Sequence, residues 1–308
     1  MHAVDTDARP QAVGSDVYAP FPLTTGPGVW GLVRTEVRTA GTTVVVHHRT
    51  GPRPVLLLHG VAGSWTTWTP LLRAADGVGD RGLVLVDLPG WGASGAPRVP
   101  LTVDGATEVL TAVLDALGLG AVDVVGHSMG AFVAMHLALR QPERVRSVSL
   151  VSGTTWAATQ ASRHPVRGVL TLPAFALLRA GLAVTRGVAL PVLRGLARVG
   201  LLRMLAAPVF THVGRLDRSV LDAFVAELRP REFLAAARTA ASYDLRRWGA
   251  VTCPVVAVAG RDDVFARLSD LDRLRALLPA ARTVLLDDCG HFAHVEHPDA
   301  VARAIGLA

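Results

Sequence analysis

One serine in a glycine-flanked turn constrains this chain more than any other feature. Residues 122–125 form an apolar, β-branched run, Gly126-His-Ser128-Met-Gly130 follows, and a stretch with helical spacing comes next. This order predicts a strand, a tight turn and a helix, because only small flanking residues allow so sharp a turn. The turn lifts the serine side chain clear of the backbone, and the helix N-terminus favours negative charge beside it. We therefore expect Ser128 to act as a nucleophile.

Two further strand ends offer partners for this serine. An apolar strand after Pro254 leads to Asp262 and Asp263, and a second strand after Thr283 leads to His291. The C-terminal ends of strands in an open α/β sheet form the crevice where ligands bind, so these side chains should meet there. His291 is the expected general base, since histidine titrates near neutral pH. Asp262 and Asp263 both remain candidates for the acid.

A third strand end predicts the groups that would stabilise an oxyanion. The apolar run 54–58 ends in His59-Gly60-Val61, and such a loop can turn the Val61 N–H toward a developing negative charge. The N–H of Met129, directly after the serine, would be the second donor. His59 is expected to support this loop, and His127 should point away from the serine.

Together these motifs resemble the α/β-hydrolase fold, in particular its cap-bearing esterases, C–C hydrolases and haloperoxidase-like enzymes. The resemblance covers about residues 30–153 and 251–306, and it rests on His59-Gly60, Asp87-x-x-Gly90-x-Gly92, Gly126-x-Ser128-x-Gly130, Gly260-x-x-Asp263 and Gly290-His291. It implies a mostly parallel, eight-stranded sheet with helices on both faces and a helical cap insert. The family pattern Gly-x-x-Asp favours Asp263 as the acid. Asp87 then belongs to a structural loop. Glu296 is expected to fix the loop that carries His291, here called the histidine loop.

The sequence predicts three parts. Residues 1–28, which lack an apolar signal core, are expected to form a flexible extension. Residues 29–153 and 251–308 are the predicted hydrolase core, and residues 154–250 are the predicted helical cap. Within the core we expect a hairpin over 34–38 and 42–48, strands over 55–59, 83–87, 122–126, 145–151 and from 255, and helices near 65–75, 103–117 and 129–140.

The insert 154–250 is both apolar and basic. It contains 14 arginines against five acidic residues, in a chain of net charge +6 that has no lysine. Arginines interrupt its most apolar part, 168–210, so no window of about 20 residues could span a membrane. We expect helices whose apolar faces cover the active site and whose arginines face water. The alternative is an insert that docks on a lipid surface through an apolar face with a basic rim.

Other partners are not indicated. No nucleic-acid-binding fold or aromatic stacking module is visible, no cluster has metal-ligand spacing, and no glycine-rich phosphate loop appears, so we expect no metal and no cofactor. Cys253 and Cys289 should lie at opposite edges of the sheet, too far apart to form a disulfide, which fits a reducing cytoplasm. Nothing in the sequence indicates an oligomeric state.

The leading functional prediction is hydrolysis of a carboxylic ester, lactone or thioester of an apolar small molecule through an acyl-enzyme. One alternative is C–C bond hydrolysis of a vinylogous diketone, because the run Cys289-Gly-His291-x-Ala-x-x-Glu296-His resembles the C–C hydrolases. The match is partial, because this chain has Phe292 at a position where C–C hydrolases often have Trp. Two others are a non-hydrolytic acyltransferase or cyclase and a ligand receptor that retains the triad. Epoxide and haloalkane hydrolases use an aspartate nucleophile, so Ser128 argues against both.

Overall fold

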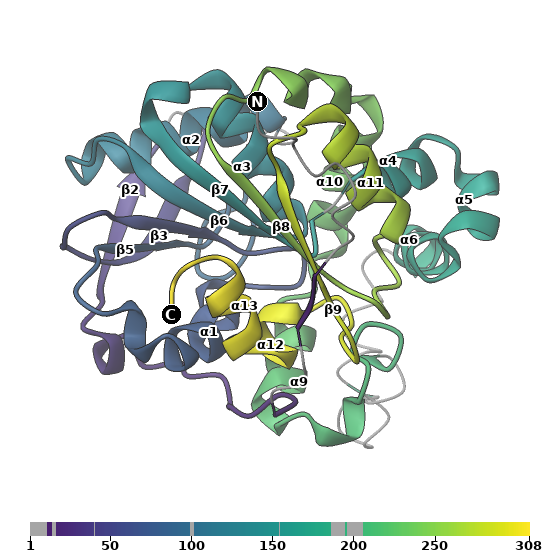
Figure 1. Ribbon diagram of the computed structural model, residues 1–308, viewed down its shortest axis with the longest axis horizontal. Helices are drawn as coiled ribbons and strands as arrows, with labels where there is room; N and C mark the ends of the chain where they lie inside the picture. Colours follow the sequence, from purple (N-terminus) through teal and green to yellow (C-terminus); the bar gives the residue numbers. More distant parts are fainter. Residues whose placement is uncertain are drawn as a thin grey trace, which may run out of the picture.

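The computed structural model describes residues 11–13, 17–39, 41–98, 102–153, 155–185, 195 and 206–308. The strands in this part of the chain are β1 (Gln11–Val13), β2 (Val33–Arg38), β3 (Thr43–Arg49), β4 (Val55–Leu58), β5 (Leu83–Val86), β6 (Val122–His127), β7 (Val145–Val151), β8 (Val255–Gly260) and β9 (Arg282–Leu286). They form one sheet in the order β1-β9-β8-β7-β6-β4-β5-β3-β2 (Figure 1). Only the pairs β2–β3 and β3–β5 are antiparallel.

Strands β4 and β5 are apolar at every position because both faces of the sheet are buried there. Leu56 and Leu58 of β4 belong to one core cluster, and Val55 and Leu57 belong to the other. Successive side chains of a strand point to opposite faces, so an unbroken apolar run fills both clusters. The first face is covered by α2 (Val103–Ala116), α3 (Met129–Arg140) and α11 (Leu268–Leu277). The second is covered by α1 (Thr69–Ala74), α12 (Ala293–Glu296) and α13 (Pro298–Ala304), seen below the sheet in Figure 1.

The predicted mostly parallel sheet with helices on both faces is confirmed, and its eight expected strands are β2–β9. The N-terminal segment differs from the expected flexible extension. Within 1–28, β1 adds a short ninth strand parallel to β9, and Tyr18 and Leu23 are buried. These side chains share a buried cluster with apolar residues of 206–221 and 292–295, but they follow no strand or helix period that could reveal it.

The sheet order reverses direction beside β4, which lies between β5 and β6. Chain segments that leave β4 and β6 therefore depart to opposite sides, and a crevice opens at the carboxyl ends of these strands. The loops after β4, β6, β8 and β9 carry Val61, Ser128, Asp263 and His291. The fold thus brings all the predicted site residues to one edge of the sheet.

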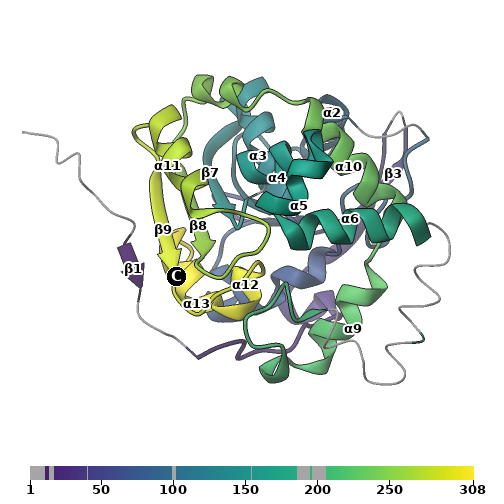
Figure 2. The same cartoon turned by 90° about the vertical axis from the view of Figure 1, so that its right-hand side faces the viewer.

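The insert is mainly helical where it is described. It contains α4 (Trp156–Arg163), α5 (Pro165–Thr171), α6 (Pro173–Thr185), α9 (Arg218–Ala226) and α10 (Pro230–Ser242), and Figure 2 shows α5 and α6 side by side. Pro173 and Pro230 begin helices, Pro208 lies in a turn, and Pro191 is outside the described residues. Exposed apolar side chains on α5 and α6 include Val166, Leu170, Leu177 and Val184. No helix in the described ranges is long and apolar enough to cross a membrane.

Candidate active site

Ser128 occupies a strained turn between β6 and α3. Its φ of 51° and ψ of −114° are uncommon for a residue with a side chain, and strain of this kind concentrates at functional sites. A side chain at Gly126 would overlap the backbone of Gly130, and one at Gly130 would overlap the carbonyl of Leu58. The Ser128 N–H donates to the Val151 carbonyl at 3.0 Å, which anchors the turn to β7. The two glycines are therefore required by close packing as well as by the turn.

Ser128, His291 and Asp263 form a hydrogen-bonded chain. The Ser128 Oγ lies 2.9 Å from His291 Nε2, and His291 Nδ1 lies 2.9 Å from Asp263 Oδ2 and 3.0 Å from Oδ1. A carboxylate only accepts hydrogen bonds, so Nδ1 carries the ring proton and Nε2 accepts from the serine hydroxyl. The side chains of His291 and Asp263 are 6% and 1% exposed, so the hydrogen bonds between them are shielded from water. Asp262 is exposed and contacts Cys289 through its N–H, so the structure brings Asp263 and not Asp262 to His291.

Sequence reasoning missed the groups that hold Asp263 in place. The N–H groups of Phe265 and Ala266 donate to Asp263 Oδ1 at 2.7 and 3.1 Å. The Phe265 ring stands edge-on to the His291 ring, with centroids 4.9 Å apart. An aspartate that accepts the N–H two residues later is a common turn, so that contact had a sequence signal. The ring contact had none, because it depends on the packing of β8 beside β9.

The oxyanion loop is oriented by His59. Leu88 donates its N–H to His59 Nε2 at 2.9 Å, so His59 Nδ1 carries the proton and donates to the Gly60 carbonyl at 2.7 Å. The peptide before Val61 is trans, and its N–H therefore points opposite to that carbonyl, away from His59. Neither the Val61 nor the Met129 N–H donates a hydrogen bond to another described residue. Both N–H groups are thus available for a developing oxyanion.

Two buried histidines lie behind His291. His127 donates Nε2–H to the His291 carbonyl at 3.0 Å, so its ring points away from Ser128 as expected. Burial and the neighbouring His294 hold the pKa of His127 well below its usual value. Burial also lowers the pKa of His294 to about 3. Both rings are therefore neutral near pH 7 and place no positive charge beside His291.

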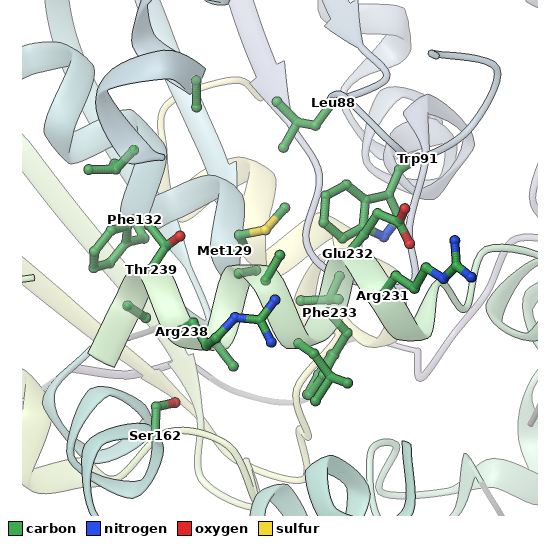
Figure 3. Close-up of a pocket in the computed structure, with 18 of the residues that line it drawn as sticks. Leu88, Trp91, Met129, Phe132, Ser162, Arg231, Glu232, Phe233, Arg238 and Thr239 are labelled. Atoms are coloured by element: carbon green, nitrogen blue, oxygen red, sulfur yellow. The ribbon is translucent and has the colours of Figure 1, made fainter. Parts of the chain in front are cut away.

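A cavity of about 950 Å³ adjoins this arrangement (Figure 3). Val61 and Met129 line it, although Ser128 itself does not. Most of its wall is apolar and comes from both parts of the chain. The core supplies Leu88, Trp91, Met129 and Phe132, and the insert supplies Phe175 and Phe233. Figure 3 shows Phe233 and Arg238 on α10 across from Met129 and Leu88.

The charged residues of the cavity wall are mainly arginines, namely Arg98, Arg179, Arg231 and Arg238, with Glu232 as the acidic one. The sequence predicted that the arginines of the insert face water. Arg231 and Arg238 are exposed and Arg179 is half-buried, and all three also line the cavity. Arg179 donates to the Ser162 carbonyl at 2.8 Å, and Arg238 forms no ion pair with any described residue. An arginine can both face water and line the cavity because its apolar stem follows the cavity wall while its guanidinium group stays in water.

Two other observations bear on ligands. Cys253 and Cys289 are both free thiols. Among the described residues, no group of three or more His, Cys, Asp or Glu side chains is arranged to hold a metal ion.

Comparison with known proteins places this geometry in a family. The family described as "Alpha/beta hydrolase family" matches residues 55–304. A 2-hydroxy-6-oxononadienedioate/2-hydroxy-6-oxononatrienedioate hydrolase of Burkholderia vietnamiensis is 32% identical over 279 residues, which cover 86% of this chain and 91% of that protein. A hydrolase of the same name from Dechloromonas aromatica is 30% identical over 281 residues, 83% of this chain and 86% of the relative.

Solved structures agree on the fold. An esterase from Thermogutta terrifontis superposes with a TM-score of 0.67 at 20% identity, covering 89% of this chain and 97% of the esterase. The epoxide hydrolase CorEH superposes with a TM-score of 0.70 at 18% identity, covering 89% of this chain and 99% of that protein. At these identities the likeness concerns the fold alone, and it is the family match over residues 55–304 that decides the assignment. The chain is a hydrolase-fold protein that belongs to the alpha/beta hydrolase family.

Proposed function

We propose that the protein is a serine hydrolase in which Ser128 attacks a carbonyl carbon, His291 is the general base and Asp263 orients His291. The observation that carries this proposal is the buried hydrogen-bonded chain from Ser128 Oγ through His291 to Asp263. A serine hydroxyl is a weak nucleophile until a neighbouring base takes its proton. The N–H groups of Val61 and Met129 are proposed to hold the negative charge on the carbonyl oxygen.

The reaction would run in two halves. In the first, the Ser128 Oγ–H proton passes to His291 as Oγ adds to the carbonyl carbon, and His291 then gives that proton to the leaving group. In the second, His291 takes a proton from water as the water oxygen adds to the acyl carbon, and His291 then returns that proton to Ser128 Oγ as the carboxylic acid leaves. Asp263 remains ionised throughout and stabilises the charged imidazole.

We further propose that the bond cleaved is a C–C bond beside a ketone, in a substrate that carries a carboxylate. The names of the curated relatives support this, and they favour it over the ester hydrolysis that the sequence first suggested. A carbon leaving group must depart as a stabilised carbanion, so the substrate would need a conjugated second carbonyl that spreads the electron pair before His291 protonates carbon. Cationic side chains on the cavity wall, such as Arg179 and Arg238, suit the carboxylate.

Ester hydrolysis is retained as the second candidate function. The same triad would perform it without a conjugated leaving group, and most of the cavity wall is apolar, as for an apolar ester. Phe292, where C–C hydrolases often have Trp, also keeps this candidate open. Acyl transfer, cyclisation and ligand reception would need a further observation in their favour.

The insert is proposed to act as a cap that selects the substrate. Its helices α6 and α10 share the cavity wall with Val61, Met129 and Phe132 of the core, which supports closure over the site. Two free thiols fit the proposed cytoplasmic location. Lipid contact through the exposed apolar residues of α5 and α6 stays a prediction, which co-sedimentation with anionic and zwitterionic vesicles would test.

One set of assays separates these proposals. The purified protein is given a 2-hydroxy-6-oxo dienoic acid, whose absorbance disappears on C–C cleavage, and in parallel a series of p-nitrophenyl esters. We expect a kcat/KM for the dienoic acid well above that for every ester. A clear preference for an ester would make the second candidate the function. A fluorophosphonate probe, located by mass spectrometry, should label Ser128, and label on another serine would exclude the proposed nucleophile.

A further inference from the structure

We propose that Tyr18 is a positioning residue for His291 and acts through the buried carboxylate of Glu296. This inference rests on the proposed function, which makes His291 the base. Glu296 ends α12, and its side chain has no exposed surface. The sequence suggested only that Glu296 ties down the histidine loop, whereas the structure connects it to two distant parts of the chain.

Glu296 first fixes the backbone on both sides of His291. Its Oε2 accepts the Gly290 N–H at 2.9 Å, and its Oε1 accepts the Phe292 N–H at 3.0 Å. His291 itself donates its N–H to the Val209 carbonyl at 3.0 Å. A small movement of this carboxylate would therefore move the imidazole that faces Ser128.

Two donors from elsewhere in the chain then fix Glu296. The Tyr18 hydroxyl donates to Oε2 at 2.9 Å, and the Thr211 N–H donates to the same oxygen at 3.1 Å. The Tyr18 hydroxyl also accepts the His212 N–H at 3.0 Å, and the Ala19 N–H donates to the Glu296 carbonyl at 2.7 Å. One phenol thus joins the N-terminal segment, the insert and the histidine loop.

The hydrogen-bond pattern around Glu296 makes the Tyr18 hydroxyl a donor to the carboxylate. All four partners of the Glu296 carboxylate donate to it, an arrangement that suits the ionised form, while burial raises the pKa of Glu296. Burial and the charge of Glu296 raise the pKa of Tyr18 far above its usual value, so the phenol keeps its proton. A buried charge that loses one of its donors is less well compensated, and its surroundings rearrange to recover a partner.

Apolar packing supports the same contact. Tyr18, Ala19 and Leu23 share a buried cluster with Val209 and Phe210 of the insert and with Phe292, the neighbour of His291; Ala206, Leu216, Val220, Leu221 and Val295 complete it. The Leu23 N–H also donates to Ser219 Oγ at 2.9 Å. Tyr18, Ala19 and Leu23 are therefore packed between the insert and the histidine loop, which gives part of the N-terminal segment a role in aligning the triad.

The test compares the two tyrosines of the chain. Tyr18→Phe removes the donor to Glu296, while Tyr243→Phe removes an equally buried hydroxyl that lies 2.9 Å from His136 Nδ1, away from the triad. Each variant is assayed well below its own unfolding midpoint, for kcat, for KM and for the rate at which fluorophosphonate labels Ser128. For Tyr18→Phe we expect kcat and the labelling rate to fall about 10- to 100-fold with KM unchanged, as for a misaligned base. For Tyr243→Phe we expect wild-type values.

The other outcomes are decisive as well. The inference would be overturned if fluorophosphonate labelled Ser128 in Tyr18→Phe at the wild-type rate, or if both variants were labelled equally slowly. Either result would leave the proposed function intact. No labelling of Ser128 in the wild type would instead overturn the proposed function, and the inference with it. Glu296→Gln keeps the shape but replaces one acceptor oxygen with an NH₂ group, so it should slow labelling at least as much as Tyr18→Phe. A Glu296→Gln protein that is labelled at the wild-type rate would also refute the role of the carboxylate.

Discussion

Replacing His294 with leucine should make the free energy of unfolding less sensitive to a fall in pH. The ring of His294 is buried between Trp68 and His127, with centroids 4.5 and 4.4 Å away, and neither of its nitrogens has a hydrogen-bond partner among the described residues. Burial lowers its pKa from 6.5 to about 3. The folded pKa is thus below the unfolded one, so the unfolded chain binds more protons between these values. Stability should therefore fall as the pH drops through this window.

The size of the effect follows from the two pKa values. Between pH 7 and pH 5 the titration of His294 alone should cost about 2 kcal/mol of the free energy of unfolding. Urea unfolding of the wild type and His294→Leu, followed by tryptophan fluorescence at both pH values, measures it. The pKa values of His59 and His127 are also lowered by burial, but these histidines remain in both proteins and largely cancel in the difference. Equal losses of stability in the two proteins would show that His294 is not held neutral by the fold.

Three further predictions concern the site. Ser128→Ala should lower kcat about 10⁴- to 10⁶-fold with folding retained, as measured by turnover and circular dichroism. Asp263→Asn should lower kcat about 10²- to 10⁴-fold by favouring the wrong tautomer of the base, and Asp262→Asn should cost much less; reversed costs would disprove the assignment. Arg238→Gln should raise KM for a carboxylate substrate about tenfold, whereas the exposed Arg246→Gln should not; equal KM values for the two would remove Arg238 from substrate binding.

The turn that carries Ser128 between β6 and α3 could be predicted from the sequence because its determinants are local. The apolar run of β6, the two glycines around Ser128 and the start of α3 follow one another directly, and each obeys its own steric rule. The choice between Asp262 and Asp263 could not be made from these residues alone. It depends on the register of β8 against β9, where Gly260 pairs with Leu286, and a shift of one residue would exchange the two side chains.

Contacts between distant segments could not be predicted from local sequence patterns. Tyr18 meets Glu296 only because the N-terminal segment crosses the histidine loop, and no periodicity in the sequence encodes that crossing. The position of Arg238 on the cavity wall likewise depends on how α10 rotates against the core. Helical spacing predicted a helix near that position, but it could not predict the contacts of α10 with α4 and α6 that place it on the cavity wall.

The cavity wall has an uneven origin along the chain. Every atom proposed to make or break a bond, from Ser128 to His291, is supplied by the sheet and its loops. Three of the four cavity arginines, together with Phe175 and Phe233, come from the helices of 155–242. Under the proposed function, mutations in those helices would therefore retarget the protein to a substrate of different charge or length while the reaction chemistry is inherited unchanged. A library restricted to the cavity positions of α6 and α10 would be an efficient starting point for changing specificity in the laboratory.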